Sequence, residues 1–515
     1  MQNRVGQDFL PKAFSSKNHK AKKLQEVEGL MFFSLIKDNV MKKNVLNSFL
    51  LLSALIFLGS CKNVMDEHLE VTNVDNTVNL SEKISAQGDL SKFTEFLKST
   101  GYDRILASSQ SFTVWAPTNA ALASLDASIT ADPAKLKDFV ANHVSLTAIQ
   151  PSKGLSDTLK VNLQNGKFAN VVGANFEEAG IVGNGQFVKN GALYIIDKAV
   201  PTKLNVWDYM LTSTDAPLQT NYISNLTGLV IDSAKATIIG YNSNGTPIFA
   251  PNPPMVTRNT YWNSTADLRV ENQQFTFFMI QDAGYTAEAA KLSLYYPNFT
   301  QSALVRDLAV KGLYTVDKLP DTLISTRGVK IPINKANIQK SYRASNGIVY
   351  VVNALPFRLK DKVPVFKIEG ERPLSFRSDR SGNTLYRTKL DNNGVLYKDI
   401  EVYNHGVSDY YINYFYSQMP VVKYKVYARA ISGAAGDSQV ANFTQRYFIL
   451  NPTTLVYDLF ATQTVTPLNY GEVLLGEYTP QQLGLFQIRL QSATSSSVNV
   501  NTLILDYLRF EPVLP

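Results

Sequence analysis

The pattern of apolar and polar positions along the chain predicts helices first and strands later. Between residues 80 and 106 apolar residues recur at mostly helical spacing, interrupted by Gly88 and Gly101, which predicts short amphipathic helices. The run 111–116 (SFTVWA) is instead strand-like and is stopped by a proline. Residues 190–197 (NGALYIID) predict a tight turn that leads into another strand.

A second, weaker copy of this pattern follows in the chain. Residues 276–283 (TFFMIQDA) take the place of the first strand, and 346–353 (NGIVYVVN) repeat the turn and strand 156 residues after Asn190. Self-similarity at a fixed interval favours a tandem duplication. The stretch 238–268, rich in Asn, Thr and Pro, is expected to form a long loop or hairpin within the second copy.

Helical periodicity largely disappears beyond about residue 360. Short β-rich runs such as 421–430 (VVKYKVYARA) alternate with turn clusters, which is typical of a sandwich or barrel. The run 503–512 (LILDYLRFEP) is expected to be a last strand that closes the sandwich. The pattern as a whole predicts an α+β multidomain protein.

The strand motifs resemble those of a known family. The segment 112–122 (FTVWAPTNAAL) is similar to the first motif of fasciclin domains, 190–197 is similar to the second, and Asn142-His143 falls where the family usually has Tyr-His. The resemblance implies a fasciclin domain at 78–202 and a divergent one at 203–360. It also implies that His143 is a buried residue that supports the core. The segment 361–515 resembles the jelly-roll modules of the galactose-binding type, so we expect an all-β jelly-roll-like sandwich there.

The region before residue 78 reads as an export signal and a tether. A basic start at Met41 is followed by an apolar run over 45–58 and by Leu58-Gly-Ser-Cys61, which is the order of a signal peptide. The run is shorter than a spanning helix needs, so a transmembrane anchor is the weaker interpretation. The last four residues resemble the bacterial lipobox, which implies that Cys61 carries lipid. We therefore expect a leader and signal peptide at 1–60, with Met41 as the true start, and a lipidated tether at 61–77.

The charge of the chain sits mostly in this leader. The whole chain has a formal net charge of +7. Residues 1–60 hold nine Lys/Arg and four Asp/Glu, so 41 basic and 39 acidic residues remain in the rest of the chain. The mature protein is thus nearly neutral. Without a basic patch or stripe we expect no nucleic-acid partner. Asp66-Glu67 resembles the surface-export signal of Bacteroidetes lipoproteins, which implies an outer membrane protein that faces the cell exterior.

Few residues beyond the leader are suited to catalysis. Only His68, His143 and His405 remain as histidines, and HExxH, paired Cys/His, GxSxG and Walker-type patterns are absent from the sequence. We expect no enzyme activity, no metal and no cofactor, with His405 as a solvated turn residue. Carboxylate pairs such as Asp379 with Asp391 leave glycoside hydrolysis as a third hypothesis.

Aromatic residues are the stronger candidates for function. Tyrosines are dense between 403 and 427, and strand alternation predicts that Tyr410, Tyr414 and Tyr416 share one face. Tyrosine suits stacking on sugars or peptides at partly wet surfaces. Trp262, in the inserted stretch, is a similar candidate for ligand binding. The alternative is that these rings fill the core or cover an interface between domains.

The resemblances together favour a non-catalytic surface lipoprotein. Such proteins resemble accessory components of starch-utilisation-type (SusC/SusD-like) outer-membrane uptake systems, which implies a membrane anchor, a transporter complex as partner, and a glycan or peptide ligand. The alternative is a cell-adhesion lipoprotein that acts through its fasciclin domains.

Overall fold

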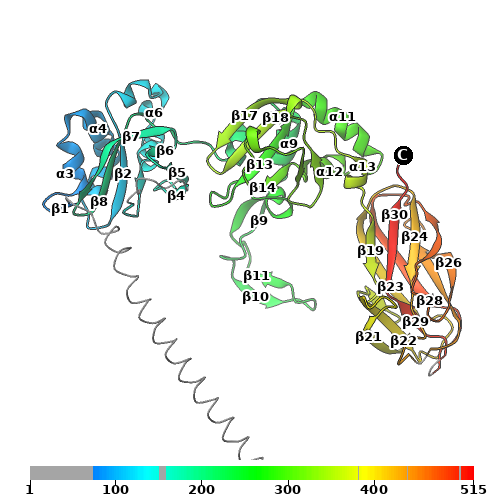
Figure 1. The fold of residues 1–515 in the computed structure, drawn as a ribbon. Coiled ribbons are helices and arrows are strands. Elements are labelled where there is room, and N and C mark those ends of the chain that lie inside the picture. Colours follow the sequence, from blue (N-terminus) through cyan, green and yellow to red (C-terminus); the bar gives the residue numbers. More distant parts are fainter. Residues whose placement is uncertain (1–73, 150–157, 381, 438, 498–499) are drawn as a thin grey trace, which may run out of the picture.

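The computed structural model describes residues 74–149, 158–380, 382–437, 439–497 and 500–515. In this part of the chain three folded bodies follow one another, coloured blue to cyan, green, and yellow to red in Figure 1. Within the same residues, the structure contains no helix with the length and apolar character needed to cross a membrane. The predicted signal peptide and Cys61 lie outside the described residues.

The first body is a sheet covered by short helices. The strand order is β3-β2-β8-β7-β6-β5-β4, with β1 added to β7, and the central strands β2 and β8 run parallel. All six residues of β2 are buried, as expected for a central strand. Its strands are β1 (Val74–Asp75), β2 (Phe112–Pro117), β3 (Val144–Ser145), β4 (Leu159–Asn162), β5 (Phe168–Val172), β6 (Asn175–Phe176), β7 (Ala179–Val188) and β8 (Gly191–Ile196).

The predicted helices between residues 80 and 106 are present. Gly101 ends α4 in the left-handed conformation, with φ 77°, which glycine adopts without steric cost. Leu80, Ile84, Phe93 and Leu97 face the core, so the helical periodicity is explained by burial. The helices of this body are α3 (Leu80–Ser85), α4 (Ser91–Thr100), α5 (Tyr102–Leu106), α6 (Ala127–Ala131) and α7 (Pro133–Ala141).

The second body is built on a sheet with order β14-β13-β18-β17. As in β3-β2-β8-β7, the two central strands are parallel and the outer strands antiparallel to them. Its strands are β13 (Phe275–Ile280), β14 (Ala309–Lys311), β15 (Thr322–Ile324), β16 (Lys330–Pro332), β17 (Ile338–Ala344) and β18 (Gly347–Val352). Its helices are α8 (Val206–Thr212), α9 (Pro217–Asn225), α10 (Thr260–Ser264), α11 (Asp282–Ser293), α12 (Thr300–Val305) and α13 (Leu359–Lys362).

The two Asn-Gly turns make the same hydrogen bonds in the two bodies. The side-chain oxygen of Asn190 accepts from the first backbone N–H of α3 at 2.9 Å, and that of Asn346 accepts from the first N–H of α8 at 2.8 Å. Each amide nitrogen also donates to two backbone carbonyl oxygens. A Cβ at Gly191 or Gly347 would lie 1.9 or 2.1 Å from the carbonyl oxygen that begins the neighbouring strand, so only glycine fits.

A β-ribbon stands away from the second body, as Figure 1 shows. It consists of β9 (Thr227–Ile231) paired with β12 (Met255–Asn259), and of β10 (Ile238–Tyr241) paired with β11 (Pro247–Phe249). All five residues of β9 are exposed. The predicted loop or hairpin at 238–268 therefore exists, but the ribbon spans 227–259 and residues 260–264 form α10.

The third body is a β-sandwich. One sheet has the order β19-β30-β24-β27, the facing sheet β20-β23-β28-β25-β26, and a third β21-β22-β29. The run 503–512 forms two strands, and β30 lies inside its sheet between β19 and β24. The strands are β19 (Phe366–Glu369), β20 (Ser375–Phe376), β21 (Asn383–Leu390), β22 (Leu396–Tyr403), β23 (Tyr411–Met419), β24 (Tyr424–Arg429), β25 (Phe443–Leu450), β26 (Tyr457–Val465), β27 (Val473–Tyr478), β28 (Gly484–Ser492), β29 (Leu503–Leu505) and β30 (Tyr507–Pro512).

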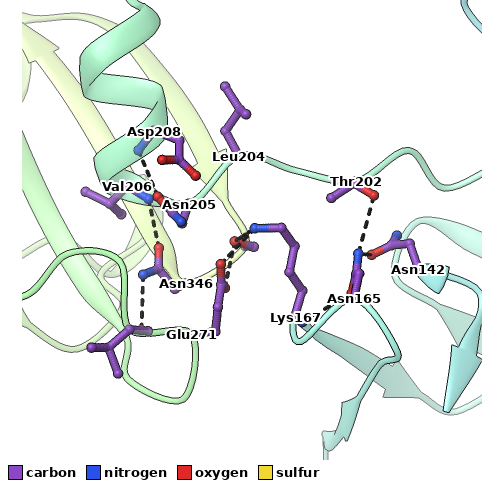
Figure 2. Close-up of polar contacts among 12 residues, drawn as sticks. Asn142, Asn165, Lys167, Thr202, Leu204, Asn205, Val206, Asp208, Glu271 and Asn346 are labelled. Carbon is purple, nitrogen blue, oxygen red and sulfur yellow. Dashed lines mark hydrogen bonds and ion pairs between the residues drawn. The ribbon is translucent and has the colours of Figure 1, made fainter. Parts of the chain in front are cut away.

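Specific polar contacts join each body to the next. Lys167 of the first body binds Glu271 of the second at 2.7 Å, and Ser345 donates to the other oxygen of the same carboxylate at 2.8 Å (Figure 2). Between the second and third bodies, the backbone N–H of Val421 donates to the carbonyl of Tyr295, and Tyr296 is buried in the hydrophobic cluster of the sandwich. The bodies are thus in direct contact at both junctions.

Candidate functional site

Tyr410, Tyr414 and Tyr416 do share one face, and that face is the core of the sandwich. Tyr414 is fully buried and donates its hydroxyl to the carbonyl oxygen of Gly370 at 3.0 Å, and Tyr410 is 2% exposed. Tyr416 is partly buried and stacks on Phe366, with ring centroids 3.8 Å apart. The alternative of a core role therefore describes Tyr410 and Tyr414, which both belong to the buried hydrophobic cluster of the sandwich.

The opposite face of the same sheet carries the exposed aromatic residues. Alternation along β23 turns Tyr411, Asn413 and Phe415 outward. In the strand register, Arg489 of β28 lies between two neighbours, Asn413 of β23 on one side and Phe448 of β25 on the other. We call this surface the outer aromatic face; its partly exposed side chains are Tyr411, Asn413, Phe415, Arg446, Phe448, Tyr457, Gln487, Arg489 and Gln491.

Arg489 organises the outer aromatic face. Its guanidinium lies 3.7 Å from the ring centroids of both Tyr411 and Tyr457. Its Nε donates to the side-chain oxygen of Asn413 at 2.9 Å, and the Tyr457 hydroxyl donates to Gln487 at 2.8 Å. The planar guanidinium is thus held between two rings, which fixes their orientation before any ligand arrives.

The sequence interpretation missed this cluster although a signal was present. Tyr411 directly follows Tyr410, so strand alternation turns it to the opposite face, and Arg489 alternates with apolar residues in the run 485–490. An arginine at an outward position of a strand, across from an outward tyrosine, would have indicated the pair. The register between β23 and β28, which the sequence does not show, was needed to bring them together.

Trp262 lies in the second body, apart from the tyrosines. It belongs to α10 at the foot of the ribbon, where the Arg269 guanidinium covers its ring at 3.2 Å and Trp207 meets it edge to face at 5.4 Å. A surface hollow of about 230 Å³ adjoins it, lined also by Arg258 and Asp267. Since Asp267 makes a bidentate ion pair with Arg269, the cation over the ring is held in place. Trp262 therefore forms a separate aromatic site and contributes nothing to the outer aromatic face.

The two described histidines are both buried. The Nδ1 of His143 donates to the carbonyl oxygen of Phe139 at 2.8 Å, and its Nε2 accepts from the backbone N–H of Val200 at 3.3 Å. Complete burial lowers the pKa of His143 to about 4. Its neutral ring therefore ties α7 to the chain after β8, which is the core-supporting role expected from the sequence.

The prediction that His405 is solvated is wrong. It is 3% exposed and stacks on Tyr410 with centroids 5.0 Å apart. The turn that holds it is bound to a neighbouring loop, because the N–H groups of Asn404 and Gly406 both donate to Ser496. This clamp turns the ring inward, and burial lowers its pKa.

The carboxylates considered for hydrolysis are engaged separately. Asp379 binds Arg377 at 2.6 Å and Asp391 binds Arg429 at 3.3 Å, so each faces an arginine of its own. Among the described residues, no group of three His, Cys, Asp or Glu side chains is arranged to hold a metal ion.

Comparisons with known proteins add a family for one segment. Similar solved structures include a FAS1 domain pair from the insect cell adhesion molecule fasciclin I, at 16% identity, covering 54% of this chain and 99% of that chain with a TM-score of 0.23. A family 35 carbohydrate binding module from Clostridium thermocellum has 15% identity and a TM-score of 0.20, and the match covers 29% of this chain and 99% of that chain. The CBM36-1 domain of a multidomain xylanase from the hindgut metagenome of Trinervitermes trinervoides has 13% identity. It covers 30% of this chain and 100% of that chain, with a TM-score of 0.18.

Scores this low leave the function to be argued from the chain's own residues. No curated protein matches the sequence. The family model described as Fasciclin domain matches residues 88–201, the segment that contains β2, β8 and His143. The fasciclin prediction is therefore confirmed for residues 88–201.

Proposed function

We propose that this protein is a non-catalytic surface lipoprotein whose C-terminal sandwich binds a glycan or peptide through the outer aromatic face. The observation that carries the proposal is the Arg489 guanidinium fixed between Tyr411 and Tyr457. Aromatic rings held rigidly at a partly wet surface offer stacking area at a low entropy cost. Beside them Gln487, whose side-chain oxygen accepts from Tyr457, and the partly exposed Gln491 carry amide groups suited to hydroxyl or peptide partners.

Residues 203–360 form, in this proposal, a divergent second fasciclin domain. Supporting it are the shared strand order and the matching Asn-Gly hydrogen bonds. Two further positions agree: Thr113 and Thr276, each second in its strand, donate to one backbone carbonyl and accept from one N–H of the neighbouring segment. The pair of domains then serves as a spacer and docking platform that carries the sandwich.

The lipid anchor at Cys61 and display at the outer membrane complete the proposal. The signal-like sequence ending in Leu58-Gly-Ser-Cys61 and the polar tether support them. An anchored binding protein that carries its ligand site at the far end of the chain suits an accessory role beside a SusC/SusD-like uptake complex. Copurification of the full-length protein with an outer-membrane transporter checks this partner, and recovery of the protein alone under mild solubilisation argues for a free-standing role.

Binding by the outer aromatic face is tested with residues 62–515 on glycan and peptide arrays. Tyr457→Ala removes one ring of the stack, and we expect roughly a fivefold loss of affinity, since stacked aromatic contacts contribute about 1 kcal/mol. The matched control is Tyr427→Ala, because Tyr427 lies under Arg509 at 4.1 Å on the other sheet. Equal losses in both variants would refute the assignment of the face.

The alternative is adhesion through the fasciclin domains. At the position of the family's Tyr-His pair, Asn142 donates to the carbonyl oxygen of Val200 and His143 is fully buried, so neither side chain is offered to a partner. Adhesion of cells or matrix to the intact protein that survives Tyr457→Ala would favour this alternative over ligand capture by the sandwich.

A further inference from the structure

The outer aromatic face carries positive charge that is not neutralised within the described part of the protein. Arg446 of β25 pairs in the ladder with Gln491, and Arg489 pairs with Phe448, so the two arginines are diagonal neighbours on one face. Diagonal neighbours in an antiparallel ladder lie about 7–8 Å apart. Two arginines are therefore neighbours on one partly exposed surface.

Among the residues that the structure describes, neither of these arginines forms an ion pair. Their ladder neighbours are neutral: Asn413 beside Arg489, and Thr462 beside Arg446. The acidic residue of β26 at this level, Asp458, pairs with the inward-facing Ile449 and accepts from Asn451. In the same sandwich, ion pairs are formed by six other cations: Arg377, Arg387, Lys389, Lys423, Arg429 and Arg509.

The other sheet provides an internal comparison. There Arg509 also covers a tyrosine, Tyr427, but its guanidinium binds Glu472 at 2.7 Å and Glu511 at 2.8 Å. An arginine thus covers a tyrosine on both sheets, but carboxylates neutralise Arg509, and among the described residues none neutralises Arg489. A guanidinium that no carboxylate of the described residues neutralises is complementary to an anion supplied from outside.

We infer that the outer aromatic face binds an acidic polysaccharide. Arg446 and Arg489 pair with the carboxylates or sulfates of the polymer, and the rings of Tyr411, Phe415 and Tyr457 stack on its sugar rings. The amides of the face hydrogen-bond to sugar hydroxyls. This inference rests on the proposed function and names its ligand class.

The test measures binding of residues 62–515 to polygalacturonate, to a sulfated polysaccharide, to carboxyl-reduced polygalacturonan and to poly-glutamate. We expect binding to one of the first two, which identifies the anion, and at least tenfold weaker binding to the carboxyl-reduced polymer if the anion is carboxylate. Affinity falls as salt rises, because the paired charges are near the surface. Arg446→Gln, a change at a partly exposed position, lowers affinity about tenfold.

The control is Lys425→Gln, which removes the same charge from an exposed position on the other sheet and leaves affinity within about twofold. Arg489→Gln is a second variant, accepted only if its melting temperature is unchanged. Equal binding to acidic and neutral glycans overturns the inference and leaves the proposed function standing. Binding to poly-glutamate alone overturns it in favour of an acidic peptide. Binding to none of the polymers by a folded protein also overturns it, while the proposed function is decided by the glycan and peptide arrays.

Discussion

His143 shows how one buried residue can link the fasciclin domain to pH. Its Nε2 accepts from Val200 only while the ring is neutral, and the pKa in the folded protein is about 4 against 6.5 in the unfolded chain. The unfolded state therefore binds the proton first as pH falls. The stability that the neutral His143 contributes is fully present above pH 6.5 and is lost as the pH falls from 6.5 to 4.

From pH 7 to pH 5 this single group should lower the local free energy of unfolding by about 2 kcal/mol. Hydrogen exchange of the peptide covering α7 and residues 142–145 in the intact protein, corrected for intrinsic rates, measures the change. Glutamine does not titrate, so His143→Gln should be less stable than the parent at pH 7, but its local free energy of unfolding should not change between pH 7 and pH 5. An equal pH slope in both proteins would assign the effect to other groups, such as His405.

The positions of strands could be predicted where the sequence marks their ends. Which face of a strand is buried could not be predicted. The motif at 112–117 and the Asn-Gly turns identified β2, β8 and β18, because a buried strand followed by Pro or preceded by a turn has few alternatives. Alternation grouped Tyr410, Tyr414 and Tyr416 correctly, yet tyrosine suits core and surface alike. Which side of β23 meets the facing sheet depends on long-range packing, so the sequence does not show whether the face shared by these tyrosines is core or surface.

The ribbon of β9–β12 and β10–β11 is an element that the second body does not need for its core. Asn259 and Thr227 are opposite each other at its base, so residues 228–258 can be replaced by a short Asn-Gly turn. Asn259, which is buried and donates to the carbonyl of Ile223, is kept. We expect the melting temperature of the shortened protein to stay within about 3 °C of the parent, since exposed side chains add little stability. Calorimetry measures it; a larger drop would show that the ribbon stabilises the second body.

At the scale of the whole molecule, the junctions decide whether the three bodies move together. Between the second and third bodies, the N–H of Val421 donates to the carbonyl of Tyr295, and Ala303 is buried in the hydrophobic cluster of the sandwich. Just before this junction the buried Nζ of Lys362 binds Asp307 and the carbonyl of Ala303, which fixes α13 to the second body, and burial lowers the pKa of Lys362 to about 8. Between the first and second, Leu204 of the connecting chain accepts from the N–H of Ser345, and its own N–H donates to the Tyr342 hydroxyl. Both junctions are therefore held by specific bonds as well as by the chain.

The Lys167–Glu271 pair is the contact that can be tested without touching either core. Both side chains are 16% exposed, so their interaction is less screened than at an open surface. Lys167→Gln should loosen the junction and broaden the distribution of distances between spin labels on two exposed residues, Lys137 of α7 and Ala287 of α11. The labels are simple to place, because Cys61 is the single native cysteine and is absent from residues 62–515.

Two further variants separate the charge pair from the other bonds at this junction. The reversed pair, Lys167→Glu with Glu271→Lys, should narrow the distribution again, with a coupling energy of about 1 kcal/mol. Lys340→Gln, which breaks an ion pair with Asp215 inside the second body, should leave the width unchanged. A width that is the same in all variants would mean that the connecting chain and its backbone hydrogen bonds hold the two bodies without help from the charge pair.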